Sequence, residues 1–115
     1  MRCVRWIVSV PVFSTTAAHA ATMRTSYYGA EAPHVAAHRT LPIGTWLIIT
    51  NPRNGRSACV MVGTRGPYTR GLDLDISMQF ATILGFRERG IEALETRVVE
   101  AGSDDHSRCS AGVKG

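Results

Sequence analysis

Apolar residues in this chain come in short runs that are broken by glycine, proline and asparagine. Five of these runs have the length and composition of strands, at residues 24–28, 45–50, 57–62, 72–76 and 94–100. The run at 72–76, Leu-Asp-Leu-Asp-Ile, alternates apolar and acidic side chains, as a strand with one buried face does. Residues 31–40 are polar and interrupted by Pro33, so we expect a loop there.

Turn and cap residues between the runs predict how they connect. Asn54-Gly55 stands between the second and third runs and predicts a hairpin, because this pair tolerates the positive φ angles of a tight turn. Ser77 is placed to cap a short helix that Gly85 would end. Five or six short strands with one helix predict an all-β fold. A small closed barrel is favoured, because closure removes the exposed sheet edges.

Three segments differ in character along the 115 residues. Residues 1–20 resemble a secretory signal peptide, with Arg2 and Arg5 before an apolar stretch and small residues around a cleavage site after Ala20. The alternative is an ordinary buried first strand. Residues 21–101 are expected to form one domain, and residues 102–115, rich in Ser, Asp and Gly, a flexible tail. Cleavage would place the protein in the periplasm or outside the cell.

The charge balance excludes some classes of partner. Removing residues 1–20 leaves eleven basic and nine acidic residues, a net charge of about +2. The arginines are scattered and form no basic run, so we expect no nucleic-acid binding and instead a mild attraction to anionic polymers such as cell-wall material. No later stretch reaches the ~18 apolar residues of a membrane span, so no stable membrane insertion is expected.

Two cysteines remain after residues 1–20 are removed. A disulfide between Cys59 and Cys109 would join the tail to a central strand, as is common in exported proteins. The alternative is a buried free Cys59 and a free Cys109 in a mobile tail. The histidines show no metal-ligand spacing and the two cysteines are fifty residues apart, so we expect neither a zinc site nor another cofactor.

Several ordered motifs then carry a family resemblance. They are Ser-Tyr-Tyr-Gly at 26–29, Ala-Ala-His-Arg-Thr-Leu-Pro-Ile-Gly-Thr at 36–45, Thr-Asn at 50–51 with Asn-Gly-Arg-Ser at 54–57, Arg-Gly-Pro-Tyr at 65–68, and residues 71–85 around Asp-Ile-Ser. In this order the chain resembles the RlpA-like family, the domain of septal lytic transglycosylases and a relative of expansins. The resemblance implies a small six-stranded double-psi β-barrel, with one short helix and a groove for polysaccharide.

The chain departs from the family pattern in three ways. The family usually has Asn-Asp-Arg-Gly-Pro where this chain has Gly-Thr-Arg-Gly-Pro, so Thr64 stands where an aspartate is expected. The loop before Ala36 is much shorter than usual and keeps only Glu31 as a possible acid. The C-terminal peptidoglycan-binding repeat domain of larger members does not occur in this sequence.

Two residues are the candidate catalytic groups. Cleaving a glycosidic bond requires a proton for the leaving oxygen, and the resemblance implies Asp75 as this acid. Its apolar neighbours Leu74 and Ile76 predict that desolvation raises its pKa. The alternative is that Asp75 caps the helix near Ser77. The family resemblance places His38 at the groove, where it would orient Asp75 or bind a sugar hydroxyl; the alternative is a turn histidine bonded to the backbone.

Four more residues are candidates for substrate binding. Tyr28 and Tyr68 lie at loop ends, where rings stack on sugars, although packing on the barrel is equally consistent with the sequence. Arg65 would hold its loop or meet a glycan carboxylate. Asp73 would share a strand face with Asp75 and could replace the aspartate missing at position 64, or simply be solvated.

The resemblance implies a peptidoglycan lytic transglycosylase that cleaves the MurNAc–GlcNAc bond and forms a 1,6-anhydro product. One carboxyl group can serve this reaction, because the C6 hydroxyl of the sugar attacks in place of water. The alternative is a non-catalytic, expansin-like module that binds peptidoglycan, which the threonine and the short loop favour. A weaker alternative is a small inhibitor or structural partner at the division site. The expected partner is the peptidoglycan glycan strand, bound by a monomer.

Overall fold

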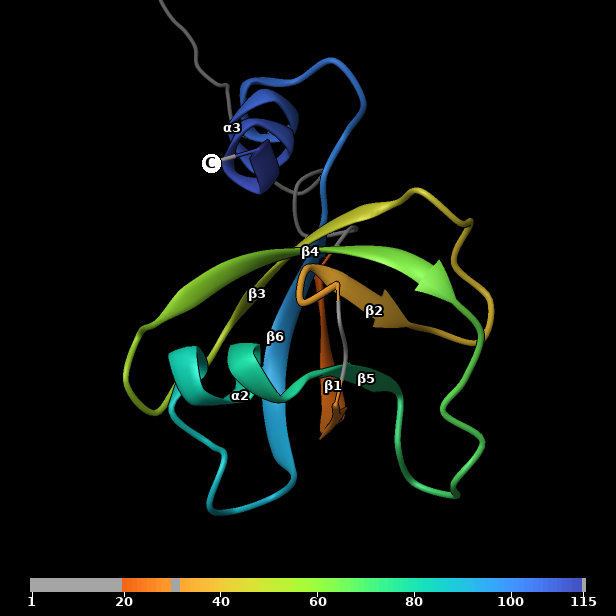
Figure 1. The fold of residues 1–115 in the computed structure, drawn as a ribbon, viewed down its shortest axis with the longest axis vertical. Coiled ribbons are helices and arrows are strands. Elements are labelled where there is room, and N and C mark those ends of the chain that lie inside the picture. The colour runs from red at the N-terminus through yellow and green to blue at the C-terminus, as the bar shows by residue number, and fades with distance from the viewer. Residues whose placement is uncertain (1–19, 30–31, 115) are drawn as a thin grey trace, which may run out of the picture.

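The computed structural model describes residues 20–29 and 32–114. Six strands form one sheet that closes into a barrel, in the order β1-β5-β2-β4-β3-β6 (Figure 1). Their bounds are β1 Ala20–Tyr28, β2 Val35–Ala37, β3 Trp46–Thr50, β4 Ser57–Thr64, β5 Leu74–Ser77 and β6 Glu92–Val98. The closed six-stranded barrel predicted from the sequence is confirmed. The predicted signal peptide lies outside the described residues, except for Ala20.

The barrel mixes parallel and antiparallel pairs. Strand β1 runs parallel to β5, and β2 runs parallel to β4, while the other four neighbouring pairs are antiparallel. Strand β1 also pairs with β6, so the first and last strands close the sheet. Because no strand in this sheet lacks a neighbour on either side, the barrel has no free sheet edge.

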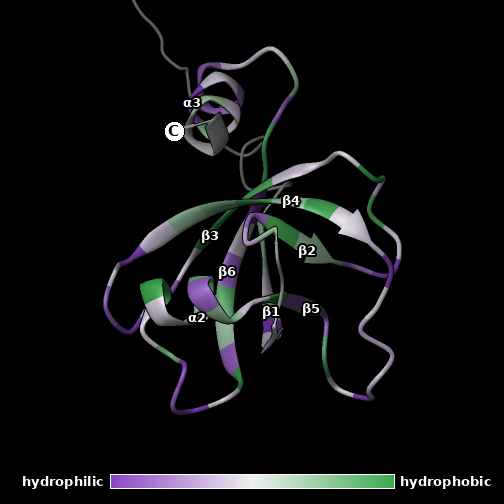
Figure 2. Cartoon of the chain, viewed as in Figure 1, coloured by the Kyte–Doolittle hydropathy of each residue, from purple (hydrophilic) through white to green (hydrophobic). Residues whose placement is uncertain are grey.

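The core lies inside the barrel, where alternate strand residues point. Its largest fully buried apolar side chains are Leu47, Ile49, Val60, Val62, Leu74, Ile76, Leu84, Phe86 and Leu94. Figure 2 shows apolar residues along β2, β3 and β4, with hydrophilic residues in the loops that join β3 to β4 and α2 to β6. The predicted runs therefore supply the core, as their alternation indicates.

Helix α2, Met78–Leu84, is the helix that the sequence predicts. The Ser77 hydroxyl accepts a hydrogen bond from the Phe80 backbone N–H at 3.3 Å and caps its first turn. Gly85 ends it in the left-handed conformation, with φ of +83°, and its N–H donates to the Ala81 carbonyl. Both predicted end residues are confirmed.

The β3–β4 hairpin is confirmed, but its turn is longer than a two-residue Asn-Gly turn. The last paired residues are Thr50 and Ser57, so six residues connect the strands. The Asn51 and Asn54 side-chain amides both donate to the Leu84 carbonyl oxygen, at 2.8 and 3.0 Å. The extra length thus allows the loop to satisfy a carbonyl at the end of α2.

One predicted loop contains a strand. The sequence predicts that residues 31–40 are irregular, yet Val35–Ala37 forms β2, which has a neighbouring strand on each side. This strand has three residues and pairs with β4 on one side and β5 on the other. A run this short carries no periodic signal of its own, and its partners, distant in sequence, determine its conformation.

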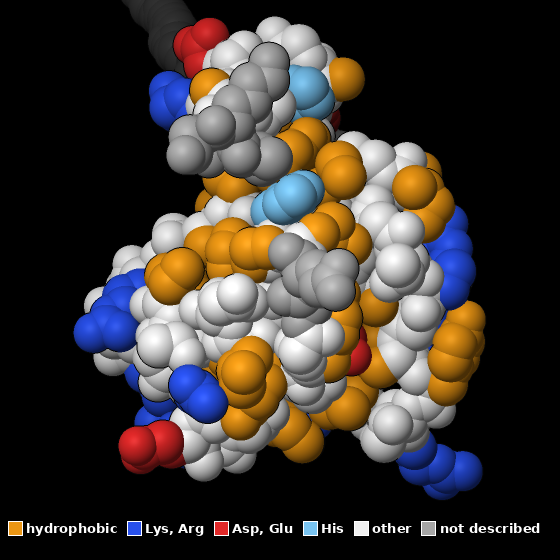
Figure 3. Space-filling view, viewed as in Figure 1, with side chains coloured by type: hydrophobic (Ala, Val, Ile, Leu, Met, Phe, Trp, Pro, Cys, Tyr) orange, Lys and Arg blue, Asp and Glu red, His pale blue; other side chains and the backbone are white. Residues whose placement is uncertain are grey.

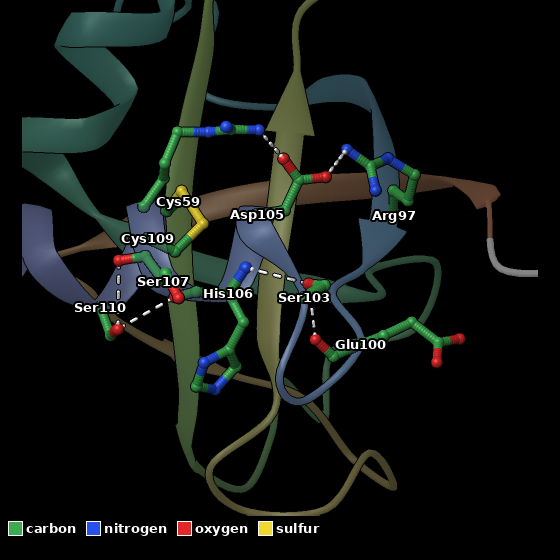
Figure 4. Close-up of a disulfide and its surroundings, with 10 residues drawn as sticks. Cys59, Arg97, Glu100, Ser103, Asp105, His106, Ser107, Cys109 and Ser110 are labelled. Carbon is green, nitrogen blue, oxygen red and sulfur yellow. Dashed lines mark hydrogen bonds and ion pairs between the residues drawn. A yellow bond between two sulfur atoms is a disulfide. The ribbon is translucent and has the colours of Figure 1, made fainter.

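A flexible tail is predicted from residue 102 onward, but the structure has a helix there, α3, Asp104–Lys114. This prediction is therefore wrong. A disulfide joins Cys109 of this helix to Cys59 of β4, which is one of the two alternatives for these cysteines (Figure 4). Cys109 is buried with Trp46 and Val99 in a small apolar cluster outside the barrel. Figure 3 shows hydrophobic side chains continuing from the barrel to the underside of α3. This packing and the covalent link explain why the polar tail is helical.

Charged and capping side chains also hold α3. Asp105 accepts from Arg97 of β6 at 3.0 Å and forms a second ion pair with Arg108 (Figure 4). These two guanidinium groups lower the pKa of Asp105. Ser103 accepts from the His106 backbone N–H at 3.1 Å, as a helix-capping residue does. No helix in the described part of the chain is both long enough and apolar enough to span a bilayer.

Candidate functional site

The candidate site is a row of four outward-facing residues on neighbouring strands. Asp75 of β5 lies opposite Ser26 of β1 on one side and Ala37 of β2 on the other, and Ala37 in turn lies opposite Thr64 of β4. Leu74 and Ile76 are fully buried inside the barrel, so the side chain between them points outward. We call Thr64, Ala37, Asp75 and Ser26 the Asp75 row.

A bulge in β4 brings Thr64 into this row. The register with β2 shifts between Ala36, which pairs with Val62, and Ala37, which pairs with Thr64. The extra residue is Gly63, and one inserted residue moves the next side chain to the other face of the sheet. A Cβ at Gly63 would lie 2.6 Å from Cγ1 of Val35, so only glycine fits there without a shift.

Asp75 has the environment of a proton donor. It is half-buried, and burial raises the pKa of its carboxyl group above the ordinary value. The Ser26 hydroxyl donates a hydrogen bond to Oδ1 of Asp75 at 2.9 Å. This bond stabilises the ionised carboxylate and lowers its pKa, but its effect is smaller than that of burial. The carboxyl is thus oriented by one hydrogen bond and is protonated at a higher pH than an exposed aspartate.

Tyr28 lies near Asp75 at the end of β1. Its hydroxyl donates to the Val35 carbonyl oxygen at 3.2 Å. Burial raises the pKa of its phenol, and the charge of Asp75 raises it further. The phenol is therefore neutral at physiological pH, and its half-buried ring lies on the same face of β1 as Ser26, two residues away.

His38 follows β2 and is bonded to the backbone. Its Nδ1 accepts from the backbone N–H groups of Thr40 at 3.1 Å and Leu41 at 3.0 Å. Burial and the nearby Arg39 lower the pKa of the imidazole, so the neutral ring is favoured. In this state Nε2 carries the proton and can donate a hydrogen bond. In the described part of the chain, the side chain that bonds to the Asp75 carboxyl is Ser26, and His38 does not bond to it.

Arg65 and Asp73 fix the loops beside the row. Arg65 Nη1 donates to the carbonyl oxygens of His38 at 3.1 Å and Leu41 at 2.6 Å, so its guanidinium holds the turn. Asp73 precedes β5; its Oδ2 accepts from the Arg24 backbone N–H at 3.0 Å, and its Oδ1 lies 3.5 Å from Nη2 of Arg39. Both side chains thus have partners in the fold.

Tyr68 is the most exposed large apolar side chain near the row, at 78% exposure. It follows a cis Gly66-Pro67 peptide bond, and the Gly66 backbone has φ of +120°. A Cβ placed on Gly66 would lie 3.7 Å from the Tyr68 ring and 4.0 Å from the Cβ of Ala37. The loop therefore lies over Ala37 and presents an aromatic ring to solvent beside the row.

Ser26 is the site residue that sequence reasoning missed as a functional group. The sequence presents it only as part of the Ser-Tyr-Tyr-Gly motif, and its contact with Asp75 depends on the parallel pairing of β1 with β5. Residues 26 and 75 are far apart in the sequence, so periodicity gives no signal for this pair. Glu31, the possible acid of the shortened loop, lies outside the described residues.

Within residues 20–29 and 32–114, no three His, Cys, Asp or Glu side chains are arranged to hold a metal ion. The Asp75 row offers one carboxyl group and two hydroxyl groups, with aromatic rings beside it. Such a set can deliver a proton to a bound oxygen and bind the hydroxyls and faces of sugars.

The fold is that of the double-psi β-barrel proteins. Cerato-platanin 3 from M. perniciosa matches with a TM-score of 0.62 and 14% identity, over 78% of this chain and 99% of that one. An expansin from Clavibacter michiganensis, solved in complex with cellohexaose, matches with a TM-score of 0.60 and 17% identity, over 73% of this chain and 52% of that one. The double-psi barrel predicted from the resemblance is confirmed.

Sequence comparison identifies the relatives more closely. The chain is 45% identical over 64 residues to the probable endolytic peptidoglycan transglycosylase RlpA of Nostoc sp., covering 56% of this chain and 17% of that protein. It is also 45% identical over 69 residues to the corresponding protein of Aquifex aeolicus, covering 60% and 30%. The predicted resemblance to the RlpA-like family is thus confirmed. The chain spans less than a third of either relative's length, and no family model matches it.

Proposed function

We propose that this domain binds peptidoglycan and cleaves the MurNAc–GlcNAc bond as a lytic transglycosylase, with Asp75 as the acid. The observation that carries this proposal is the half-buried, outward-facing carboxyl of Asp75, whose pKa is raised by burial and which Ser26 orients. Two further findings support it: the relatives carry the name endolytic peptidoglycan transglycosylase RlpA, and an expansin with this fold was solved with a bound oligosaccharide.

The reaction needs only one carboxyl group. Protonated Asp75 gives its proton to the glycosidic oxygen, and the bond between that oxygen and C1 of MurNAc breaks. The C6 hydroxyl of the same sugar attacks C1, and the Asp75 carboxylate accepts the proton that this hydroxyl loses. The products are a 1,6-anhydro sugar end and a free hydroxyl on the departing GlcNAc, and Asp75 returns to its starting state.

The other residues would bind and orient the glycan. Ser26 keeps the carboxyl pointing outward, and the exposed ring of Tyr68 offers a face for stacking on a sugar. Tyr28 adds a neutral ring beside Asp75. His38 donates through Nε2 to a sugar hydroxyl, while Arg65 acts on the shape of the turn rather than on substrate.

Digestion of purified sacculi tests the enzyme. We expect the wild-type protein to release anhydro-muropeptides, detected by mass spectrometry, and the Asp75→Asn variant to release none. Asp73→Asn is the matched control, because it neutralises a carboxyl two residues away that bonds to the Arg24 backbone and Arg39. Equal release by Asp75→Asn and the wild type would remove Asp75 from the mechanism.

The second candidate function is a non-catalytic module that grips glycan in the manner of expansins. Thr64 favours it, because a hydroxyl occupies the row where the family has a carboxylate, and a hydroxyl cannot act as an acid or a base at neutral pH. Wild-type protein that sediments with sacculi and releases no soluble product would select this function over cleavage.

We also propose that residues 1–20 are a signal peptide and that the mature domain acts as a monomer outside the cytoplasm. The Cys59–Cys109 disulfide supports export, because such bonds persist in oxidising compartments. Expression of the whole chain in a bacterial host, followed by mass spectrometry of the periplasmic fraction, should give a protein that begins at Ala21. An intact N-terminus in the cytoplasmic fraction would contradict this assignment.

A further inference from the structure

Two segments that follow neighbouring strands hold one another through arginine side chains. We call residues 38–41, after β2, the His38 turn, and residues 65–73, between β4 and β5, the Tyr68 loop. Strands β2 and β4 are parallel neighbours, so both segments leave the same end of the barrel (Figure 1). Each segment contributes one arginine to the other, Arg39 from the turn and Arg65 from the loop.

The two guanidinium groups donate in opposite directions. Arg65 Nη1 donates to the first and last carbonyl oxygens of the His38 turn, at 3.1 and 2.6 Å. Arg39 Nη1 donates to the carbonyl oxygens of Pro67 at 2.9 Å and Leu72 at 2.5 Å. The contact of 3.5 Å between Arg39 Nη2 and Asp73 Oδ1 is long and adds little. Two side chains thus bind four backbone carbonyls of irregular segments.

These side chains replace backbone hydrogen bonds that the two segments lack. Among residues 20–29 and 32–114, no backbone N–H donates to any of the four carbonyl oxygens. A guanidinium carries its donors in a rigid plane, so one arginine can bridge two carbonyls that no strand or helix pairs. The conformation of the His38 turn and the Tyr68 loop therefore depends on Arg39 and Arg65 as well as on the sheet.

Both segments present side chains beside the Asp75 row. The Tyr68 ring is 78% exposed on a loop that lies over Ala37. His38 binds the backbone of its turn through Nδ1, which leaves Nε2 to donate. Burial lowers the pKa of this imidazole, and the charges of Arg39 and Arg65 lower it further, so the clasping arginines also favour the neutral ring. The two arginines therefore act on both side chains that flank the row.

We propose that Arg39 and Arg65 are positioning residues, which hold the His38 turn and the Tyr68 loop in one fixed arrangement and so pre-organise a binding surface for a sugar strand. This inference rests on the proposed function and adds to it two residues that determine glycan affinity through other side chains. A surface that is ordered before binding loses less conformational entropy when the ligand arrives. Removing either arginine therefore weakens binding without removing a group that touches the sugar.

Amide relaxation of the ¹⁵N-labelled protein tests the ordering, with no glycan present. We expect backbone order parameters of about 0.85 in both segments of the wild type, and values below about 0.6 in the Tyr68 loop of Arg39→Gln and in the His38 turn of Arg65→Gln. Arg56→Gln is the matched control, because Arg56 Nη1 donates to the Ile83 carbonyl oxygen at 3.3 Å in another part of the fold. It removes the same charge and the same kind of contact, and both segments should stay ordered.

Digestion of sacculi tests the effect on the glycan. In Arg39→Gln and Arg65→Gln, the sacculus concentration that gives half-maximal release of anhydro-muropeptides should rise roughly three- to tenfold. The maximal rate should stay within about twofold of the wild-type rate, because the hydrogen bond between Ser26 and Asp75 involves neither arginine.

A lysine variant separates position from charge. Arg39→Lys keeps the positive charge, but its side chain is shorter and ends in one nitrogen instead of a planar fork. We expect it to lose loop order and glycan affinity as Arg39→Gln does. Wild-type affinity in Arg39→Lys without recovered loop order would assign the effect to charge and overturn the inference.

The remaining outcomes separate this inference from the proposed function. Order parameters that both glutamine variants retain would overturn it, and so would lower order with an unchanged half-maximal concentration. Wild-type protein that binds sacculi and releases nothing would contradict cleavage alone, and sedimentation of the same variants would then measure the three- to tenfold loss of affinity. Wild-type protein that does not bind at all would contradict the proposed function, while the relaxation data would still decide whether the two arginines order the segments.

Discussion

At the scale of single residues, Asp75 combines an outward direction with partial burial. Burial raises the pKa of its carboxyl in the folded protein above the ordinary value of 3.8, while the unfolded chain keeps that value. The unfolded state therefore releases the proton at a lower pH, so the contribution of Asp75 to stability is full below pH 3.8 and is lost as the pH rises through the folded-state pKa.

A first prediction follows for Asp75→Asn. Its amide cannot ionise but can still accept the Ser26 hydrogen bond, so we expect the variant to unfold at the same or a higher temperature than the wild type at pH 7. The difference should vanish near pH 3. Thermal unfolding followed by circular dichroism at both pH values measures it. A clearly lower unfolding temperature at pH 7 would contradict the sign worked out above.

A second prediction concerns His38. Alanine at this position leaves the backbone N–H groups of Thr40 and Leu41 without their acceptor, and we expect a loss of roughly 1 kcal/mol in the free energy of unfolding. Asparagine can accept through its side-chain oxygen and should lose less. Because the pKa of His38 is lowered in the fold, its contribution should also fall as the pH drops below 6.5. Urea unfolding of both variants at pH 7 and pH 5 tests this.

How far sequence predicts a residue's role differs from one residue to the next. The direction and partial burial of Asp75 follow from the alternation of residues 72–76, because neighbouring apolar side chains point inward. The partner of Asp75 could not be predicted, since Ser26 reaches it only through the pairing of strands distant in sequence. Asp73 was expected to share a strand face with Asp75, but β5 begins one residue later, at Leu74.

At the scale of elements, the glycine that ends α2 is a local signal whose contribution to stability can be measured. Gly85→Ala places a Cβ in the left-handed conformation and 2.6 Å from Nδ2 of Asn54, which bonds to the end of the helix. Gly90→Ala is the matched control, with φ of +82° and nothing within 4 Å of its Cβ. We expect Gly90→Ala to cost about 1 kcal/mol and Gly85→Ala clearly more, in urea unfolding. Equal losses in the free energy of unfolding would show that the Asn54 side chain moves away from the new Cβ at no cost.

Elements with their own capping and periodic residues are the ones that the sequence predicts. Helix α2 has Ser77 and Gly85 at its ends, and the β3–β4 hairpin has apolar runs on both sides. Strand β2 has only three residues. Helix α3 has a capping residue, Ser103, but its polar sequence lacks the apolar periodicity that predicts a helix. Both depend on contacts with β4, through backbone pairing for β2 and through the disulfide for α3.

At the scale of the whole molecule, a single disulfide links α3 covalently to the barrel. Replacing Cys59 and Cys109 by serine removes a link that closes a loop of 50 residues, and chain entropy gives an upper value of roughly 4 kcal/mol for its contribution. We expect α3 to separate from the barrel and expose Trp46, while the barrel keeps its β circular dichroism.

Fluorescence measures this separation. A Trp6→Phe background leaves Trp46 as the single tryptophan of the chain. Trp46 is buried beside Cys109, so its emission should shift to the red when α3 leaves. A double serine variant with unchanged emission would mean that the apolar contacts alone hold the helix.

The pairing of β1 with β6 has a consequence for how the protein is made. Residues 20–25 find their partners at residues 92–97, so the ribosome must have delivered residue 97 before the sheet can join on itself. Until then the nascent chain lacks the contacts that complete a cooperative native state. A chain that cannot finish folding while it is being synthesised stays in the unfolded condition that the proposed export through a translocation channel would require.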